Sequence, residues 1–243
     1  MKNEIENQWL LSALSEGVKR SGDLIAQITD YHGGPVTTEY MLTSDIAREL
    51  IEQNYEVEVE YLNRRIITGL TMRKSGVRKK FGSRRTDIAV LMSKVVPLAI
   101  IEVKIGVKTL NKIKGDLLKI TDTIRSPKPQ FAARVRGAVV FQVHVAGSAN
   151  RLHVRQLNHA VKKIEKSLRT SLRAYKKAHA DFRFTLYPLQ SGDEGIVATE
   201  LEPDGNGRRE GHATRYYAVL VRSKQRAGGA PLKFRQLKAQ SSN

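Results

Sequence analysis

The sequence predicts an α/β protein in which helices flank a central sheet. Strand-like apolar runs, such as 87–92 and 98–105, alternate along the chain with segments that repeat apolar residues at three- and four-residue spacing. At 243 residues and 40% hydrophobic content, the chain can bury a substantial core. We divide it into an N-terminal helical segment (1–34), a main domain (35–224) and a basic tail (225–243) that we expect to be flexible.

The N-terminal third is predicted to be mostly helical. Apolar residues recur at helical spacing over 4–30 with a break at Ser21-Gly22, which predicts a helical hairpin packed on the core. A second helix is expected over 36–54. Residues 55–62 alternate strictly between polar and apolar, as expected of a strand with one face toward water.

Two apolar segments then predict buried strands. Residues 87–92 and 98–105 are apolar on both faces, so we place them at the centre of the sheet. If they form a hairpin with its turn near residue 94, Asp87 lies opposite Glu102.

A helix over 110–124 and a buried strand over 137–145 complete the predicted core, 36–145. We expect the C-terminal α+β extension, 150–224, to contain a long basic helix at 152–180, strands at 182–189 and 214–222, and a Gly-rich surface loop at 191–212.

Asp87, Glu102 and Lys104 are charged residues inside these apolar strands. Burying such groups is costly unless an ion pair, hydrogen bonds or a metal compensates them. Residues two apart on a strand point to the same face, so Glu102 and Lys104 share one side of the sheet. With Asp87 opposite Glu102, two carboxylates and one ammonium converge. A buried ion pair or solvated edge-strand charges would be a purely structural explanation.

This arrangement resembles the active site of the PD-(D/E)xK nuclease superfamily, which has the restriction-endonuclease-like fold. Asp87 matches the aspartate of the motif, and Glu102-Val103-Lys104 matches its (D/E)xK element. Thr86 stands where the motif usually has proline, a position at which members vary. The predicted order of helix, three strands, helix and strand is also similar to the superfamily's αβββαβ core, with its central mixed sheet.

The resemblance implies roles for these residues. Asp87 and Glu102 would hold Mg²⁺, for which Mn²⁺ would substitute, and the Val103 carbonyl would add a third oxygen ligand. Lys104 would hydrogen-bond the attacking water and offset charge on the phosphate. Its two neighbouring carboxylates should keep Lys104 protonated until the metal binds.

Superfamily members often add a glutamate from the helix before the sheet. Glu39 is in phase with the apolar face of that predicted helix, so we choose it as the additional catalytic residue, with Glu49 as the second candidate. The alternative for Glu39 is an ordinary first-turn glutamate favoured by the helix dipole. Asp116 and Lys119 on the later helix are weaker candidates, for which a solvated face is the simpler interpretation.

The net charge favours a polyanionic partner. The chain has 42 Lys and Arg against 24 Asp and Glu, a formal charge of +18. Seven basic residues lead directly into the first site carboxylate, and we expect them to contact DNA phosphates: Arg73, Lys74, Arg78, Lys79, Lys80, Arg84 and Arg85. For the lysines of the helix at 152–180, DNA contact and simple solvation are equal alternatives.

Other features narrow the setting. The chain has no cysteine, which excludes disulfides and thiolate zinc sites, and its six histidines lack the spacing of metal ligands. It has neither an apolar stretch of bilayer length nor a signal-peptide pattern. We therefore expect an intracellular, cytoplasmic protein that does not bind membranes.

Together these features predict a magnesium-dependent endonuclease that hydrolyses DNA, in duplex form, in restriction, defence or repair. A homodimer would suit cleavage of both strands. Two alternatives stay open: a non-catalytic nucleic-acid-binding module that keeps the charged residues as structure, and a structure-selective junction resolvase.

The basic segment provides a first prediction. If Arg78, Lys79 and Lys80 contact phosphates, neutralising all three should lower the log-log salt dependence of duplex binding by roughly two to three units, at about 0.9 per phosphate. Binding to all duplex sequences should weaken alike. Affinity measured across a salt series, in a catalytically inactive background, checks this, and an unchanged slope would mean that the segment is only solvated.

Overall fold

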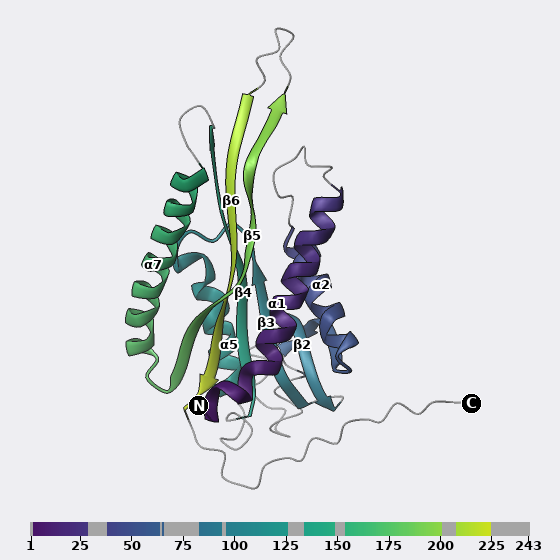
Figure 1. Ribbon diagram of the computed structural model, residues 1–243. Coiled ribbons are helices and arrows are strands. Elements are labelled where there is room, and N and C mark those ends of the chain that lie inside the picture. Colours follow the sequence, from purple (N-terminus) through teal and green to yellow (C-terminus); the bar gives the residue numbers. More distant parts are fainter. Residues whose placement is uncertain are drawn as a thin grey trace, which may run out of the picture.

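A six-stranded mixed sheet lies between two layers of helices in the part of the chain that the computed structural model describes (Figure 1). That part comprises residues 2–28, 38–63, 65, 83–93, 96–125, 134–148, 154–200 and 208–224. The strand order is β1-β2-β3-β4-β6-β5. The strands are β1 (Glu56–Leu62), β2 (Arg85–Ser93), β3 (Val96–Lys104), β4 (Arg136–Ser148), β5 (Phe182–Glu200) and β6 (Arg208–Ser223). The predicted α/β class is confirmed.

The two helical layers bury opposite faces of the sheet. The helices are α1 (Lys2–Ile28), α2 (Glu39–Glu52), α5 (Asn111–Arg125) and α7 (Val154–Ala178). Side chains alternate along each strand, so Ile100 packs in the core beneath α5 and α7, whereas Ile101 packs in the core beneath α1 and α2. The order α2, β1, β2, β3, α5, β4 is the order of elements predicted for the core.

The central hairpin has the predicted register at its site end. Ile88 pairs with Ile101 and Val90 with Ala99, and continuing this register places Asp87 opposite Glu102. Toward the turn the pairing shifts, so Leu91 pairs with residue 97 rather than with residue 98. Residues 94 and 95, where the turn was expected, lie outside the described residues.

The predicted N-terminal hairpin is wrong, because α1 is one continuous helix through Ser21 and Gly22. A glycine inside a helix costs only about 1 kcal/mol, and α1 offsets this by burying Leu10, Leu14 and Val18.

No helix among the described residues is long and apolar enough to cross a membrane.

The predicted surface loop at 191–212 is also wrong over most of its length. β5 continues to Glu200 and β6 begins at Arg208, and together they form a long hairpin that extends beyond the helices (Figure 1). β6 pairs with β4 as far as Ser148–Glu210 and with β5 on its other edge, so backbone pairing outweighs the Gly-rich composition. Register shifts in β5 near Ser191 and Ala198 absorb the irregular sequence. The predicted flexible tail, 225–243, lies outside the described residues.

Gly137 sets how closely α5 approaches the sheet. A Cβ added there would lie 2.2 Å from Ile120 Cγ2, so the absence of a side chain allows α5 to pack directly on β4. This contact fixes the turn of α5 that carries Lys119, next in sequence to Ile120.

Gly17 and Gly22 of α1 form a matched pair for testing the packing of α1 on α2. A Cβ at Gly17 would lie 2.7 Å from the Ile46 Cα, whereas one at Gly22 would meet nothing within 4 Å. Gly17→Ala should therefore lower the free energy of unfolding by about 1 to 3 kcal/mol, because backbone must move. Gly22→Ala should raise it by up to about 1 kcal/mol through helix propensity. Urea denaturation measures both, and a Gly17→Ala protein as stable as Gly22→Ala would contradict the packing.

Candidate active site

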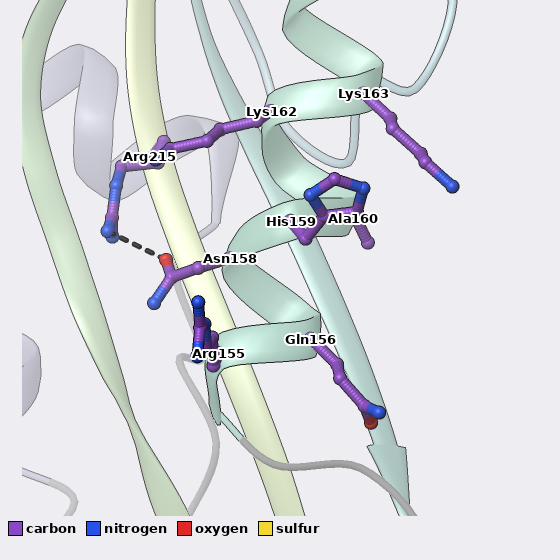
Figure 2. A pocket seen from close by; sticks show the side chains of 8 residues that line it. All are labelled: Arg155, Gln156, Asn158, His159, Ala160, Lys162, Lys163 and Arg215. Carbon is purple, nitrogen blue, oxygen red and sulfur yellow. Dashed lines mark hydrogen bonds between the residues drawn. The ribbon is translucent and has the colours of Figure 1, made fainter.

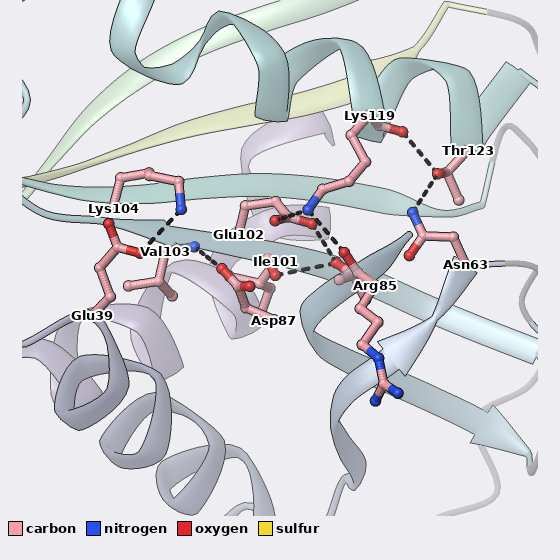
Figure 3. Close-up of polar contacts among 11 residues, drawn as sticks. Glu39, Asn63, Arg85, Asp87, Ile101, Glu102, Val103, Lys104, Lys119 and Thr123 are labelled. Atoms are coloured by element: carbon pink, nitrogen blue, oxygen red, sulfur yellow. Dashed lines mark hydrogen bonds and ion pairs between the residues drawn. The ribbon is translucent and has the colours of Figure 1, made fainter. Parts of the chain in front are cut away.

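The candidate site lies at the end of the β2–β3 hairpin, where side chains of β2 bond to β3. The last backbone pair at this end is Ile88 with Ile101. Beyond it, the Val103 N–H donates to Asp87 Oδ2 at 2.7 Å (Figure 3). This bond satisfies a backbone donor of β3 and fixes the Asp87 carboxylate beside the Glu102-Val103-Lys104 element.

Thr86 orients the second carboxylate. Its Oγ1 lies 2.7 Å from Glu102 Oε1 and donates to it, and it also lies 3.3 Å from the Ile101 carbonyl oxygen. Thr86 is itself buried. Thr86 therefore contributes a hydrogen bond that fixes the Glu102 carboxylate.

Glu102 is a buried carboxylate, only 1% exposed, and its Oε2 forms an ion pair with Lys119 Nζ of α5 (Figure 3). Burial raises the pKa of Glu102 to about 8, the nearby Asp87 charge adds to this rise, and Lys119 and Thr86 oppose it. A further cation near Glu102 would favour its ionised form.

Lys104 extends from the end of β3 to Glu39 of α2, with 3.1 Å between Nζ and Glu39 Oε2. Partial burial by itself would lower the pKa of Lys104. The hydrogen bond that Lys104 donates to Glu39 and the charges of Asp116, Glu39 and Asp87 outweigh burial, so the pKa of Lys104 lies above its ordinary value. The raised pKa agrees with the expectation that carboxylates favour the protonated lysine, but of the two carboxylates expected only Asp87 contributes, and the direct partner is Glu39.

Two residues of α5 belong to the same group, contrary to the interpretation of their helix face as solvated. Lys119 is 20% exposed, pairs with Glu102 and donates to the Arg85 carbonyl at 2.8 Å. Burial raises the pKa of Asp116, with Lys104 and Lys119 lowering it and Asp87 and Glu39 raising it. The sequence did hold a signal, because these charges lie one turn apart beside buried positions of the same helix. We call the whole group the carboxylate–lysine cluster: Glu39, Asp87, Glu102, Lys104, Asp116 and Lys119.

Hydrogen bonds join α5 to the residue that follows β1, and that residue to the one that precedes β2. Asn63 Nδ2 donates to Thr123 Oγ1 at 3.2 Å, and Thr123 Oγ1 donates to the Lys119 carbonyl at 2.7 Å (Figure 3). The backbone N–H of Asn63 donates to the Arg84 carbonyl at 3.0 Å. These bonds hold the Lys119 turn over the strand that carries Asp87.

Of the two glutamates proposed on α2, only Glu39 reaches the cluster. Glu49 Oε2 lies 3.2 Å from Arg20 Nη2, and Glu49 Oε1 accepts from Gln53 Nε2 at 2.9 Å. Glu49 therefore links α2 to α1 rather than to the site.

The basic segment is described only at its end. Arg84 and Arg85 are exposed, and Arg85 Nη1 donates to the Glu60 carbonyl at 3.2 Å. The other predicted phosphate contacts lie outside the described residues: Arg73, Lys74, Arg78, Lys79 and Lys80.

The donors of the cluster suit a hard divalent cation in kind, because carboxylate and carbonyl oxygens are the ligands that Mg²⁺ takes from proteins. Within the described part of the chain, no group of three His, Cys, Asp or Glu side chains is arranged to hold a metal. Each of these carboxylates already has a partner: Glu102 pairs with Lys119, Glu39 pairs with Lys104, and Asp87 accepts a hydrogen bond from the Val103 N–H. A cation that binds Asp87, Glu102 and the Val103 carbonyl would take over part of the compensation that Lys119 provides.

Comparisons with protein-family models, with curated proteins and with solved structures give no match to this chain. We therefore infer function from the chemistry of the cluster.

The raised pKa of Glu102 predicts a pH effect on stability. As pH rises from about 4.5 to 8, Glu102 loses its proton in the unfolded chain before it does so in the folded protein, where the ionised form then pairs with Lys119, so this group makes stability fall as pH rises. The Glu102→Gln protein lacks this dependence. The difference between its free energy of unfolding and that of wild type should therefore grow by roughly 1 to 4 kcal/mol from the lower to the upper end of this pH range. Urea denaturation at a series of pH values measures the difference, and parallel curves for the two proteins would contradict the raised pKa.

Proposed function

We propose that this protein is a magnesium-dependent nuclease of the PD-(D/E)xK type that hydrolyses phosphodiester bonds in DNA, with Mn²⁺ able to replace Mg²⁺. The observation that carries the proposal is the gathering of Asp87, Glu102 and Lys104 at one end of the β2–β3 hairpin. The charge of Asp87 acts on the pKa of Glu102 and on the pKa of Lys104, so the three side chains interact electrostatically.

The proposed reaction needs a bound cation, which supplies charge to polarise the phosphate and to acidify a water molecule. Asp87, Glu102 and the Val103 carbonyl would hold it. Asp87 is already oriented by the Val103 N–H and Glu102 by Thr86, so little side-chain freedom would be lost on binding.

Lys104 has the properties of a transition-state donor. Its ammonium is held at the site by Glu39 and stays charged because of the surrounding carboxylates. A positively charged, preorganised donor beside a scissile phosphate stabilises the negative charge that develops in the transition state. Glu39 would act by positioning Lys104.

The arrangement of elements supports the same proposal. The order of α2, three strands, α5 and β4 in a mixed sheet is similar to that of the restriction-endonuclease-like core, and Asp87, Glu102 and Lys104 lie on its β2–β3 hairpin. The charge of +18 favours a polyanionic substrate, for which duplex DNA is our choice. Cleavage of both strands would favour a homodimer.

One observation favours a non-catalytic nucleic-acid-binding module as the second candidate. The Lys119 ion pair and the Val103 N–H compensate Glu102 and Asp87 without any metal, as a purely structural cluster would require. Cleavage of plasmid, linear duplex, single-stranded and branched DNA, with and without Mg²⁺, separates the two functions. Selective cleavage of the branched substrate would instead identify a junction resolvase.

Substitution of the motif residues tests the mechanism. Asp87→Ala and Glu102→Gln should abolish Mg²⁺-dependent cleavage while leaving the protein folded and able to bind DNA, because each removes a metal ligand. Lys104→Ala should slow the chemical step by about 2 to 4 kcal/mol, the usual loss for one preorganised donor, without preventing Mg²⁺ binding. Single-turnover cleavage measures the rates, and calorimetric titration measures Mg²⁺ binding.

The two glutamates of α2 provide the control. Glu39→Gln should slow cleavage because it releases Lys104, whereas Glu49→Gln removes the same charge from the same helix away from the cluster and should leave the rate unchanged. Normal cleavage by folded Asp87→Ala and Glu102→Gln proteins, freed of contaminating nuclease, would refute the catalytic assignment.

A further inference from the structure

A strongly basic hollow lies along the N-terminal half of α7 and beside β6. Its volume is about 990 Å³, and the described residues that line it include Arg155, Lys162, Lys163 and Arg215 (Figure 2). None of the described lining residues is acidic. We call this hollow the α7 groove.

The side of the groove nearest β6 has a regular construction. Arg155, Asn158 and Lys162 follow at three- and four-residue spacing, so they lie along one side of α7 and face Arg215 (Figure 2). Arg215 is held in place, because Nη2 donates to Asn158 Oδ1 and Nη1 donates to the Thr214 carbonyl, both at 2.8 Å. The groove therefore contains an oriented guanidinium rather than mobile charges alone.

The positive charge of α7 is not balanced within the helix. α7 carries eight Lys or Arg residues and one acidic residue, Glu165. Glu165 forms an ion pair with Arg169 at 2.7 Å and accepts a hydrogen bond from the Tyr217 hydroxyl at 3.1 Å. Lys162 and Lys163 are exposed. Like charges gathered in a concave surface attract a polyanion more strongly than the same charges spread over a convex one.

The α7 groove lies on the same face of the sheet as the α5 side of the carboxylate–lysine cluster. Lys104 pairs with Phe141 and Phe141 with Tyr217, which forms one row across β3, β4 and β6. Arg215 is two residues further along β6 on the Tyr217 face. Two strand spacings and two residues of rise place the Cα atoms of Lys104 and Arg215 on the order of 12 Å apart. At about 3.4 Å of helix axis per nucleotide, this distance corresponds to about four nucleotides of one strand.

We propose that the α7 groove binds the phosphate backbone of a nucleic acid, a few nucleotides from the bond that the cluster cleaves. The cations, the amide of Asn158 and the open shape suit a chain of phosphates, and the short path to the cluster favours nucleic acid over an acidic protein. The inference rests on the proposed function for the cleavage step, but binding by the groove does not require catalysis.

The test compares two triple variants of α7 that remove equal charge. Arg155→Gln, Lys162→Gln and Lys163→Gln together neutralise the groove, whereas Lys166→Gln, Arg173→Gln and Lys177→Gln together neutralise exposed positions of the same helix that do not line it. Binding of a labelled DNA duplex is measured in EDTA across a salt series, so that a failure of cleavage cannot affect the result. All six positions are exposed, and thermal unfolding of each variant confirms folding.

The groove variant should bind more weakly, with its log-log salt slope lower by up to about 2 to 3 units, whereas the control variant should keep most of the wild-type slope. Arg215→Gln alone should also lower the slope by about 1. Equal effects of the two triple variants, no effect of the groove variant, or equal competition by polyglutamate would each overturn the proposal. Cleavage by wild type in Mg²⁺ is measured separately, so loss of groove binding and loss of the nuclease assignment can be told apart.

Discussion

The buried carboxylate of Glu102 is the group on which the arrangement of the site depends. At 1% exposure, a carboxylate must be compensated, and here Thr86 and Lys119 provide the compensation from two different elements. α5 must therefore lie close enough to β3 for Lys119 to reach, which Gly137 permits by allowing Ile120 onto β4. The same burial raises the pKa of Glu102. Ionised Glu102 is therefore costly in the fold, and a cation that binds beside it is favoured.

The mixed sheet connects this site to the rest of the molecule. β3 is antiparallel to β2 and parallel to β4, so the ends of β2 and β3 that carry Asp87 and Lys104 meet beside the row that continues to Tyr217 on β6. α2 contributes Glu39 from one layer, and α5 contributes Asp116 and Lys119 from the other. A nucleic acid bound in the α7 groove would approach the cluster along the face that α5 and α7 share.

Local patterns predicted the central elements well because the physical signal was local. β2 and β3 are apolar on both faces since they are central, and the register of their hairpin follows from the alternation of side chains. The continuity of α1 was missed because a Ser-Gly pair breaks a helix only when packing does not compensate it. The strands predicted at 182–189 and 214–222 were shorter than β5 and β6. The pairing of β5 and β6 with each other and with β4 cannot be predicted from their Gly-rich sequence.

The sequence by itself determined that Asp87, Glu102 and Lys104 share one end of a central hairpin, because strand alternation and register depend on residues close together in the chain. It also determined the basic character of α7. Only the tertiary structure decided which charges compensate them: Lys119 for Glu102, and Glu39 rather than Glu49 for Lys104. Such partners come from helices packed on opposite faces of the sheet. Their distances depend on contacts like Ile120 on Gly137, which join residues far apart in sequence.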